Sequence, residues 1–269
     1  SLQMRVSVFH VIVNVTTTCL LLPFTKYLVK YSCLVIKDKS EDKNEFTLRY
    51  VDDRLLSAPP IALLQVKKEM EYILELVEEN MTLSFEAMKN GITVNGERIK
   101  TNEAVIDFTN DALTKFLIKL AAGASQSDER IIGSYFHVIN DLERIGDHAE
   151  DFYEIGEEML VKKIEFSKKA QNGIQMMYDN VLQMLVIAKD AFINLNKGGL
   201  CELADLENSV DGMKKELIAS HFSRLAEGNC SIEVSPYYSS AILGIERVAD
   251  HLVNIGYSIV NPVGTLEEN

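Results

Sequence analysis

The sequence predicts an all-α protein of two tandem three-helix bundles, preceded by one apolar helix of membrane-spanning length. Three observations predict this class. The 269 residues include no Trp, only five Pro and only fourteen Gly, and this scarcity of helix breakers favours long helices. Apolar residues recur at intervals of three and four through most of the chain. A short acidic signature occurs twice, about a hundred residues apart, which indicates an internal repeat.

The first segment, residues 1–36, differs in composition from the rest of the chain. Residues 6–25 contain no Asp, Glu, Lys or Arg and have about the length that spans a bilayer core. His10, Asn14 and Thr16 would suit packing against other membrane helices better than contact with lipid. We therefore expect a membrane-derived helix here. A signal peptide and a soluble amphipathic helix are the alternatives.

Residues 37–58 are expected to link this helix to the rest of the chain. The linker begins with the charged run KDKSEDKN and, after Glu45, continues as FTLRYVDDRLLSA. It ends at Pro59-Pro60, and residues before proline avoid the helical region. An extended arm is therefore predicted, and helical periodicity begins after Pro60.

Beyond this linker, the periodicity predicts two units of three long helices each. Gly-containing steps such as Asn90-Gly91 and Gly198-Gly199 separate the helices. Three amphipathic helices bury their apolar faces most simply in an antiparallel bundle. The predicted units are residues 59–162 and 163–269, with helices over 61–89, 102–122, 129–160, 167–195, 200–226 and 236–260.

Within these units, acidic pairs recur at matching places. The signature at Glu143–His148 returns at Glu246–His251, and 246 − 143 = 103 residues separate the copies. Glu and Asp four residues apart lie on one helix face and repel by about 0.2–0.5 kcal/mol. Four such pairs at duplicated positions predict that a metal ion or a basic side chain offsets the repulsion. The pairs are Glu103/Asp107, Glu143/Asp147, Glu207/Asp211 and Glu246/Asp250.

Oxygen-rich clusters of this kind suit hard cations, whereas the neighbouring His148 and His251 also allow zinc or iron. Each histidine directly follows its aspartate, so it points about 100° away from it on the helix. The alternative interpretation is that the acids are solvated, with Arg144 and Arg247 as their partners from helix to helix, and that the histidines are structural.

No enzyme motif accompanies the acidic pairs. A di-iron carboxylate bundle needs Glu-x-x-His, and no Glu lies three residues before any of the five His. Phosphate-binding loops, serine nucleophile elbows and the H-E-x-x-H zinc motif are also absent from the sequence. We expect a protein that is not an enzyme, with a carboxylate-bridged metalloenzyme as a remote alternative. The 40 acidic against 27 basic residues argue against a nucleic-acid partner.

The duplicated pattern resembles the PhoU family of phosphate-uptake regulators. The resemblance rests on two tandem three-helix units with Glu-x-x-x-Asp on the second and third helices and Glu-Arg-x-x-Asp-His on the third. It implies multinuclear clusters of iron or another cation, with zinc, manganese and magnesium as further candidates. The family's third helix often continues as Asp-His-x-x-Asn-Ile, which Asn254-Ile255 fits and Asp151-Phe152 does not. The implied metal ligands are Glu103, Asp107, Glu143 and Asp147 in one set, and Glu207, Asp211, Glu246 and Asp250 in the other.

The N-terminal part is similar to the last membrane helix and linker of bacterial sodium/phosphate cotransporter-like proteins, which carry a PhoU-like domain at their cytoplasmic C-terminus. This implies a regulatory domain that controls phosphate uptake from the cytoplasmic face of the inner membrane. Its partners would be the transporter's membrane domain, the inner membrane through the first helix, and a second copy of the chain. The alternative is a free-standing PhoU-type regulator of phosphate ABC transport and signalling. The residues that carry this similarity are His10, Asn14-Val15, Leu21–Phe24, Val51–Leu56 and Pro59-Pro60.

Overall fold

The computed structural model describes residues 2–21, 46–228 and 230–258. It divides into two units, Ser1–Thr47 and Leu48–Asn269. The first unit contains helix α1 (Leu2–Leu21), so a helix forms where the apolar segment predicts one. No helix in the described ranges combines the length and the hydropathy that a membrane crossing requires. The end of the charge-free stretch and the charged start of the linker lie outside the described residues.

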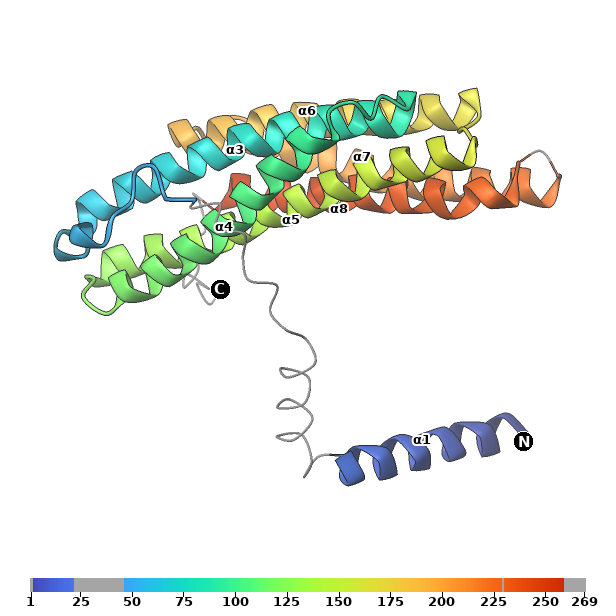
Figure 1. Ribbon diagram of the computed structural model, residues 1–269, viewed down its shortest axis with the longest axis horizontal. Coiled ribbons are helices and arrows are strands. Elements are labelled where there is room, and N and C mark those ends of the chain that lie inside the picture. The colour runs from blue at the N-terminus through green and yellow to red at the C-terminus, as the bar shows by residue number, and fades with distance from the viewer. Residues whose placement is uncertain (1, 22–45, 229, 259–269) are drawn as a thin grey trace. The chain divides into compact units, whose positions relative to one another are not determined.

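The second unit is all-helical, with no strand among its described residues, which confirms the predicted fold class. Six long helices run back and forth along one axis (Figure 1). The predicted and observed ends agree within a few residues, except at the start of the second long helix. The helices are α3 (Pro59–Asn90), α4 (Gly96–Ala121), α5 (Gln126–Lys162), α6 (Lys168–Asn194), α7 (Leu200–Ala226) and α8 (Ser235–Tyr257), with short 3-10 turns η2 (Asp53–Ser57) and η3 (Ile232–Val234).

Helix α4 begins at Gly96, six residues before the predicted start at Asn102. Asn95 is the N-cap residue of this helix. The cause is tertiary, because Ile99 is fully buried in a small cluster with Ala87 and Tyr153. Burying this side chain favours the extra helical turn over a free loop.

The arm before α3 is held against the bundle rather than extended throughout. The backbone N–H groups of Arg49 and Tyr50 donate to the two carboxylate oxygens of Glu69, at 3.1 and 2.7 Å. Glu69 is buried on α3, and Val51 beside these N–H groups is also buried. The segment then forms the 3-10 turn η2, where Asp52 accepts a hydrogen bond from the backbone N–H of Arg54.

The two repeats pack within themselves and then against each other. Helices α3, α4 and α5 contact one another, and so do α6, α7 and α8. The repeats join mainly through α5 against α8, with α3 touching α6, and they share one continuous core. A Cβ on Gly244 of α8 would lie 2.7 Å from the ring of Phe152 on α5, so the two helices need a glycine at this close approach. The packing therefore brings the two signature-bearing helices side by side.

Candidate metal centre

The acidic faces of α4 and α5 meet in the first repeat. Glu103 and Asp107 lie one turn apart on α4, and Asp147 faces them from α5. One oxygen from each of these three carboxylates lies within 4.8 Å of the other two. Three carboxylates at this spacing repel strongly unless a cation or protons lie among them. The structure thus brings together three of the four residues predicted for the first set.

Glu103 is the most unusual of these carboxylates. It is 6% exposed, and neither of its oxygens has a hydrogen-bond partner. Burial, followed by the charges of Asp107 and Asp147, raises the pKa of Glu103 to about 8. Gly146 makes room for the carboxylate, since a Cβ there would lie 2.8 Å from its Oε2. A buried carboxylate without a partner fits a bound cation, because the ion would supply the missing interaction.

The fourth predicted ligand, Glu143, lies outside the three-residue group. Its Oε2 lies 3.5 Å from Nε of Arg144, whose Nη1 lies 3.0 Å from Oδ2 of Asp147. Arg144 is thus a partner of these two acids, but within α5 and not between helices as the alternative interpretation expected, and one guanidinium faces several carboxylates. Burial and the neighbouring Asp147 raise the pKa values of both Glu143 and Asp107.

Sequence reasoning missed Asn110. It lies three residues after Asp107 on α4, and its side-chain Oδ1 is buried without a hydrogen-bond partner. An amide oxygen is an ordinary ligand for hard cations. The available signal was the i, i+3 spacing from Asp107, which places both side chains on one helix face.

The second set of acids is arranged differently, because a lysine lies among them. Nζ of Lys214 is 3.0 Å from Oδ1 of Asp211 and 2.5 Å from Oε1 of Glu246. The hydrogen bond from Lys214 lowers the pKa of Asp211. Burial, followed by neighbouring acids, raises the pKa values of Glu207 and Asp250. Among the described residues, no three members of this set reach the spacing of the first group.

Two sequence differences between the repeats explain the contrast. Lys214 corresponds to Asn110, since 214 − 110 = 104 is also the offset between Glu207 and Glu103. Ala249 corresponds to Gly146, since 249 − 146 = 103. The first repeat therefore has an amide and an open space where the second has an ammonium and a methyl group. The first set fits a cation, whereas in the second set Lys214 already supplies the positive charge.

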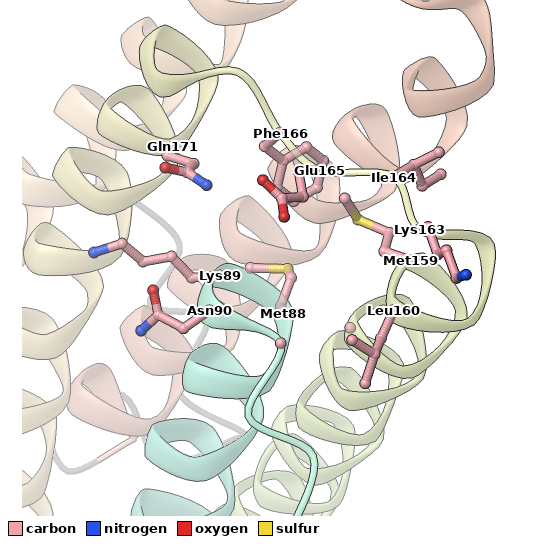
Figure 2. Close-up of a pocket in the computed structure, with 12 residues that line it drawn as sticks. Met88, Lys89, Asn90, Met159, Leu160, Lys163, Ile164, Glu165, Phe166 and Gln171 are labelled. Carbon is pink, nitrogen blue, oxygen red and sulfur yellow. The ribbon is translucent and has the colours of Figure 1, made fainter.

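A further cavity, of about 410 Å³, lies where the end of α3 meets the connection between α5 and α6 (Figure 2). Met88, Met159 and Phe166 give it apolar walls. The ammonium groups of Lys89 and Lys163 lie on opposite sides of it. Its polar groups therefore do not converge on one point, and it offers less to a charged ligand than the acidic cluster.

The PhoU domain family model matches the chain twice, over residues 71–156 and 174–259. The two matches fall on the two three-helix repeats, and each includes both acidic pairs of its repeat. The duplication that the sequence predicts is therefore the duplication of a known domain.

Two kinds of curated relative are similar to the chain. The "Putative inorganic phosphate export protein YjbB" of Salmonella typhimurium is 21% identical over 97% of this chain. The chain spans about half of that relative's length, 48%. The "Phosphate-specific transport system accessory protein PhoU homolog 1" of Thermotoga maritima is 24% identical over 74% of this chain and 85% of that protein.

Solved structures of similar proteins share the fold. PhoU from Pseudomonas aeruginosa superposes with a TM-score of 0.69 at 20% identity, over 77% of this chain and 98% of that chain. The phosphate transport system regulatory protein PhoU from Streptococcus pneumoniae superposes with a TM-score of 0.66 at 22% identity, over 78% of this chain and 100% of that chain. At these identities the likeness establishes the tandem-bundle fold.

Proposed function

The chain belongs to the PhoU family, and we propose that it regulates phosphate transport by docking on a membrane transport protein at its cytoplasmic face. The observation that carries this proposal is the match of the family model to both repeats. The names of the relatives, which describe phosphate transport accessory, regulatory and export proteins, support the same class of process. The protein acts by binding and not by catalysis.

Two arrangements are open to such a regulator. A free-standing PhoU-type regulator of phosphate ABC transport and signalling is supported by an accessory protein of which this chain covers 85%, and by solved structures of which it covers 98% and 100%. A regulatory domain attached to a sodium/phosphate cotransporter-like membrane protein is the second arrangement. The export-protein relative is similar over 97% of this chain, but its name specifies neither sodium coupling nor an attached regulatory domain, so the comparisons favour the free-standing arrangement. Cell fractionation distinguishes the two arrangements. An antibody to the α3–α8 region would detect whether the native protein is in the membrane fraction or in the soluble fraction.

We further propose that the regulator holds a hard cation, iron, manganese or magnesium, in its first repeat. Glu103, Asp107 and Asp147 would supply carboxylate oxygens, and Asn110 an amide oxygen. Glu143 would become a further ligand only after its side chain moves toward the other three carboxylates. The cation would remove the repulsion among these acids and fix α4 against α5, which stiffens one face of the bundle for docking. The second predicted set would bind a cation only after Lys214 is displaced.

The test is phosphate uptake in cells that carry the chain as their regulator. Replacing Asp107 and Asp147 with Ala should abolish the response of uptake to phosphate supply while leaving the protein folded. Asp111→Ala is the matched control, since Asp111 is an exposed acid on α4 that pairs with Lys115. The regulatory proposal fails if deletion of the whole chain leaves uptake and its response unchanged. The metal proposal fails separately if the double variant regulates normally and retains its metal in elemental analysis.

A further inference from the structure

A cluster of buried polar side chains lies where the end of α7 is followed by the start of α8. His221 on α7 is 2% exposed. Its Nε2 lies 2.8 Å from Oγ of Ser235, and its Nδ1 lies 3.7 Å from Sγ of Cys230 in the connection between the two helices. Burial, followed by the charge of Arg224, lowers the pKa of His221, so the ring is neutral at pH 7. With the Nε2 proton donated to Ser235, Nδ1 is an acceptor that faces the thiol.

Two side chains beside this pair have hydrogen-bond donors without acceptors. Tyr238 is 1% exposed, and its hydroxyl is buried without a partner. Its ring centre lies 4.7 Å from that of His221. Arg224 donates from Nη1 to Oγ of Ser220, at 3.2 Å, but its Nε and Nη2 are buried without partners. Buried donors are nearly always paired in folded proteins, so these donors indicate an oxygen atom that a ligand would supply.

The hydroxyl of Tyr238 lies close enough to Arg224 and Cys230 for both to act on it. Burial raises the pKa of Tyr238, the neighbouring guanidinium of Arg224 opposes this rise, and Cys230 adds to it. The thiol, the imidazole and the unpaired donors therefore belong to one site. Cys230 is partly exposed, so a small solute can reach its sulfur from solvent.

The chemistry of this cluster favours a reactive thiol over a metal site. Within the described part of the chain, no third His, Cys, Asp or Glu comes within ligand spacing of Cys230 and His221. The positive charge of Arg224 would also repel a cation. A partly exposed thiol beside a histidine and an arginine is the typical environment of a reactive cysteine, because these groups favour the thiolate.

From this geometry we infer that Cys230 is a modification site for hydroperoxides, which oxidise it to the sulfenic acid. Nδ1 of His221 takes the thiol proton, and the thiolate sulfur attacks one oxygen of hydrogen peroxide. The O–O bond breaks as the S–O bond forms, and the second oxygen leaves as hydroxide, which takes the proton from His221 and becomes water. The sulfur loses two electrons and the peroxide gains them. Arg224 and Tyr238 donate hydrogen bonds to the peroxide oxygens, where negative charge develops.

The oxidation is reversible by thiols. A low-molecular-weight thiol condenses with the sulfenic acid to a mixed disulfide and releases water. A second thiol then releases reduced Cys230 together with a disulfide of the two small molecules. The inference concerns the junction of α7 and α8, and it does not depend on a role in phosphate transport.

The test compares two cysteines of the same full chain. The protein is treated with hydrogen peroxide, sulfenic acid is trapped with dimedone, and mass spectrometry of the separate peptides follows each cysteine. Cys230 should be labelled about tenfold faster than Cys201, although Cys201 is the more exposed of the two. Alkylation by iodoacetamide is the reference reaction, because it involves no peroxide oxygen, and the preference for Cys230 should be clearly smaller there.

A tyrosine variant tests the role of the unpaired hydroxyl. Tyr238→Phe removes the hydroxyl and keeps the ring, and it should slow the oxidation of Cys230 about threefold or more. Tyr257→Phe is the matched control on the same helix, since the Tyr257 hydroxyl donates to the backbone oxygen of Leu200.

Oxidation of Cys230 that is no faster than that of Cys201 would overturn the proposal. The same preference for Cys230 in the peroxide and iodoacetamide reactions would overturn it too, because the thiol would then be merely accessible. An equal effect of the two tyrosine variants also counts against it. If Tyr238→Phe does not fold, the comparison of the two reagents on the wild-type chain decides.

Discussion

Replacing Glu103 with Gln should stabilise the metal-free protein and remove its first metal site. The change keeps the size of the side chain and deletes a buried charge. Glu103 is 6% exposed and its oxygens have no partners, so without metal it must fold either charged and unpaired or protonated.

The magnitude follows from the raised pKa. Burial moves the pKa of Glu103 from 4.5 to about 8. The folded state therefore holds a proton that the unfolded state releases, and stability falls as pH rises between these values, by about 1.4 kcal/mol per pH unit. At pH 7 the cost is roughly 3 kcal/mol. The side-chain amide of a glutamine at this position would also lack hydrogen-bond partners. We therefore expect Glu103→Gln to recover only about 2 kcal/mol of the stability lost at pH 7.

The assay is urea unfolding in chelator at pH 5, 7 and 8. The variant should gain little at pH 5 and progressively more at pH 7 and 8. Glu207→Gln is the matched control from the second repeat, where the glutamate is only half-buried and should give a clearly smaller gain. Destabilisation of the metal-free protein by Glu103→Gln at pH 8 would contradict a buried, unpaired charge at this position. The same pH dependence of stability in wild type and variant would also contradict it.

Metal affinity of the first repeat should rise up to tenfold per pH unit between pH 6 and 8, because a cation must displace the proton of Glu103; titrations at several pH values measure this. Lys214→Asn, which copies Asn110, should add metal equivalents in elemental analysis, and an unchanged stoichiometry contradicts the role given to the ammonium. Glu69→Ala should cost about 2 kcal/mol in urea unfolding, because two N–H groups of the arm lose their acceptor. Gly244→Ala should cost about 1–3 kcal/mol, since the methyl group overpacks the repeat interface; an unchanged unfolding midpoint contradicts this.

Much of the fold was predictable from the sequence because it is encoded locally. Apolar spacing and the scarcity of Gly and Pro predicted all six long helices of the repeats, and the copied signature predicted their grouping in threes. The start of α4 and the docking of the arm were not predictable. They depend on Ile99 and Glu69, whose burial is decided by helices distant in sequence.

In the candidate metal site, too, some features are encoded locally in the sequence and others depend on helix packing. The sequence by itself determined which acidic side chains share a helix face, because a motif at fixed helical spacing fixes the direction of its side chains. Only the tertiary structure decided how they meet. It buries Glu103 above Gly146, leaves the side-chain oxygen of Asn110 without a partner and inserts Lys214 between Asp211 and Glu246. It also brings His148 near His251 across the repeats. Helical periodicity sets the direction of a side chain, but burial and pairing depend on which helix packs opposite, and equivalent motifs in the two repeats therefore acquired different electrostatic environments.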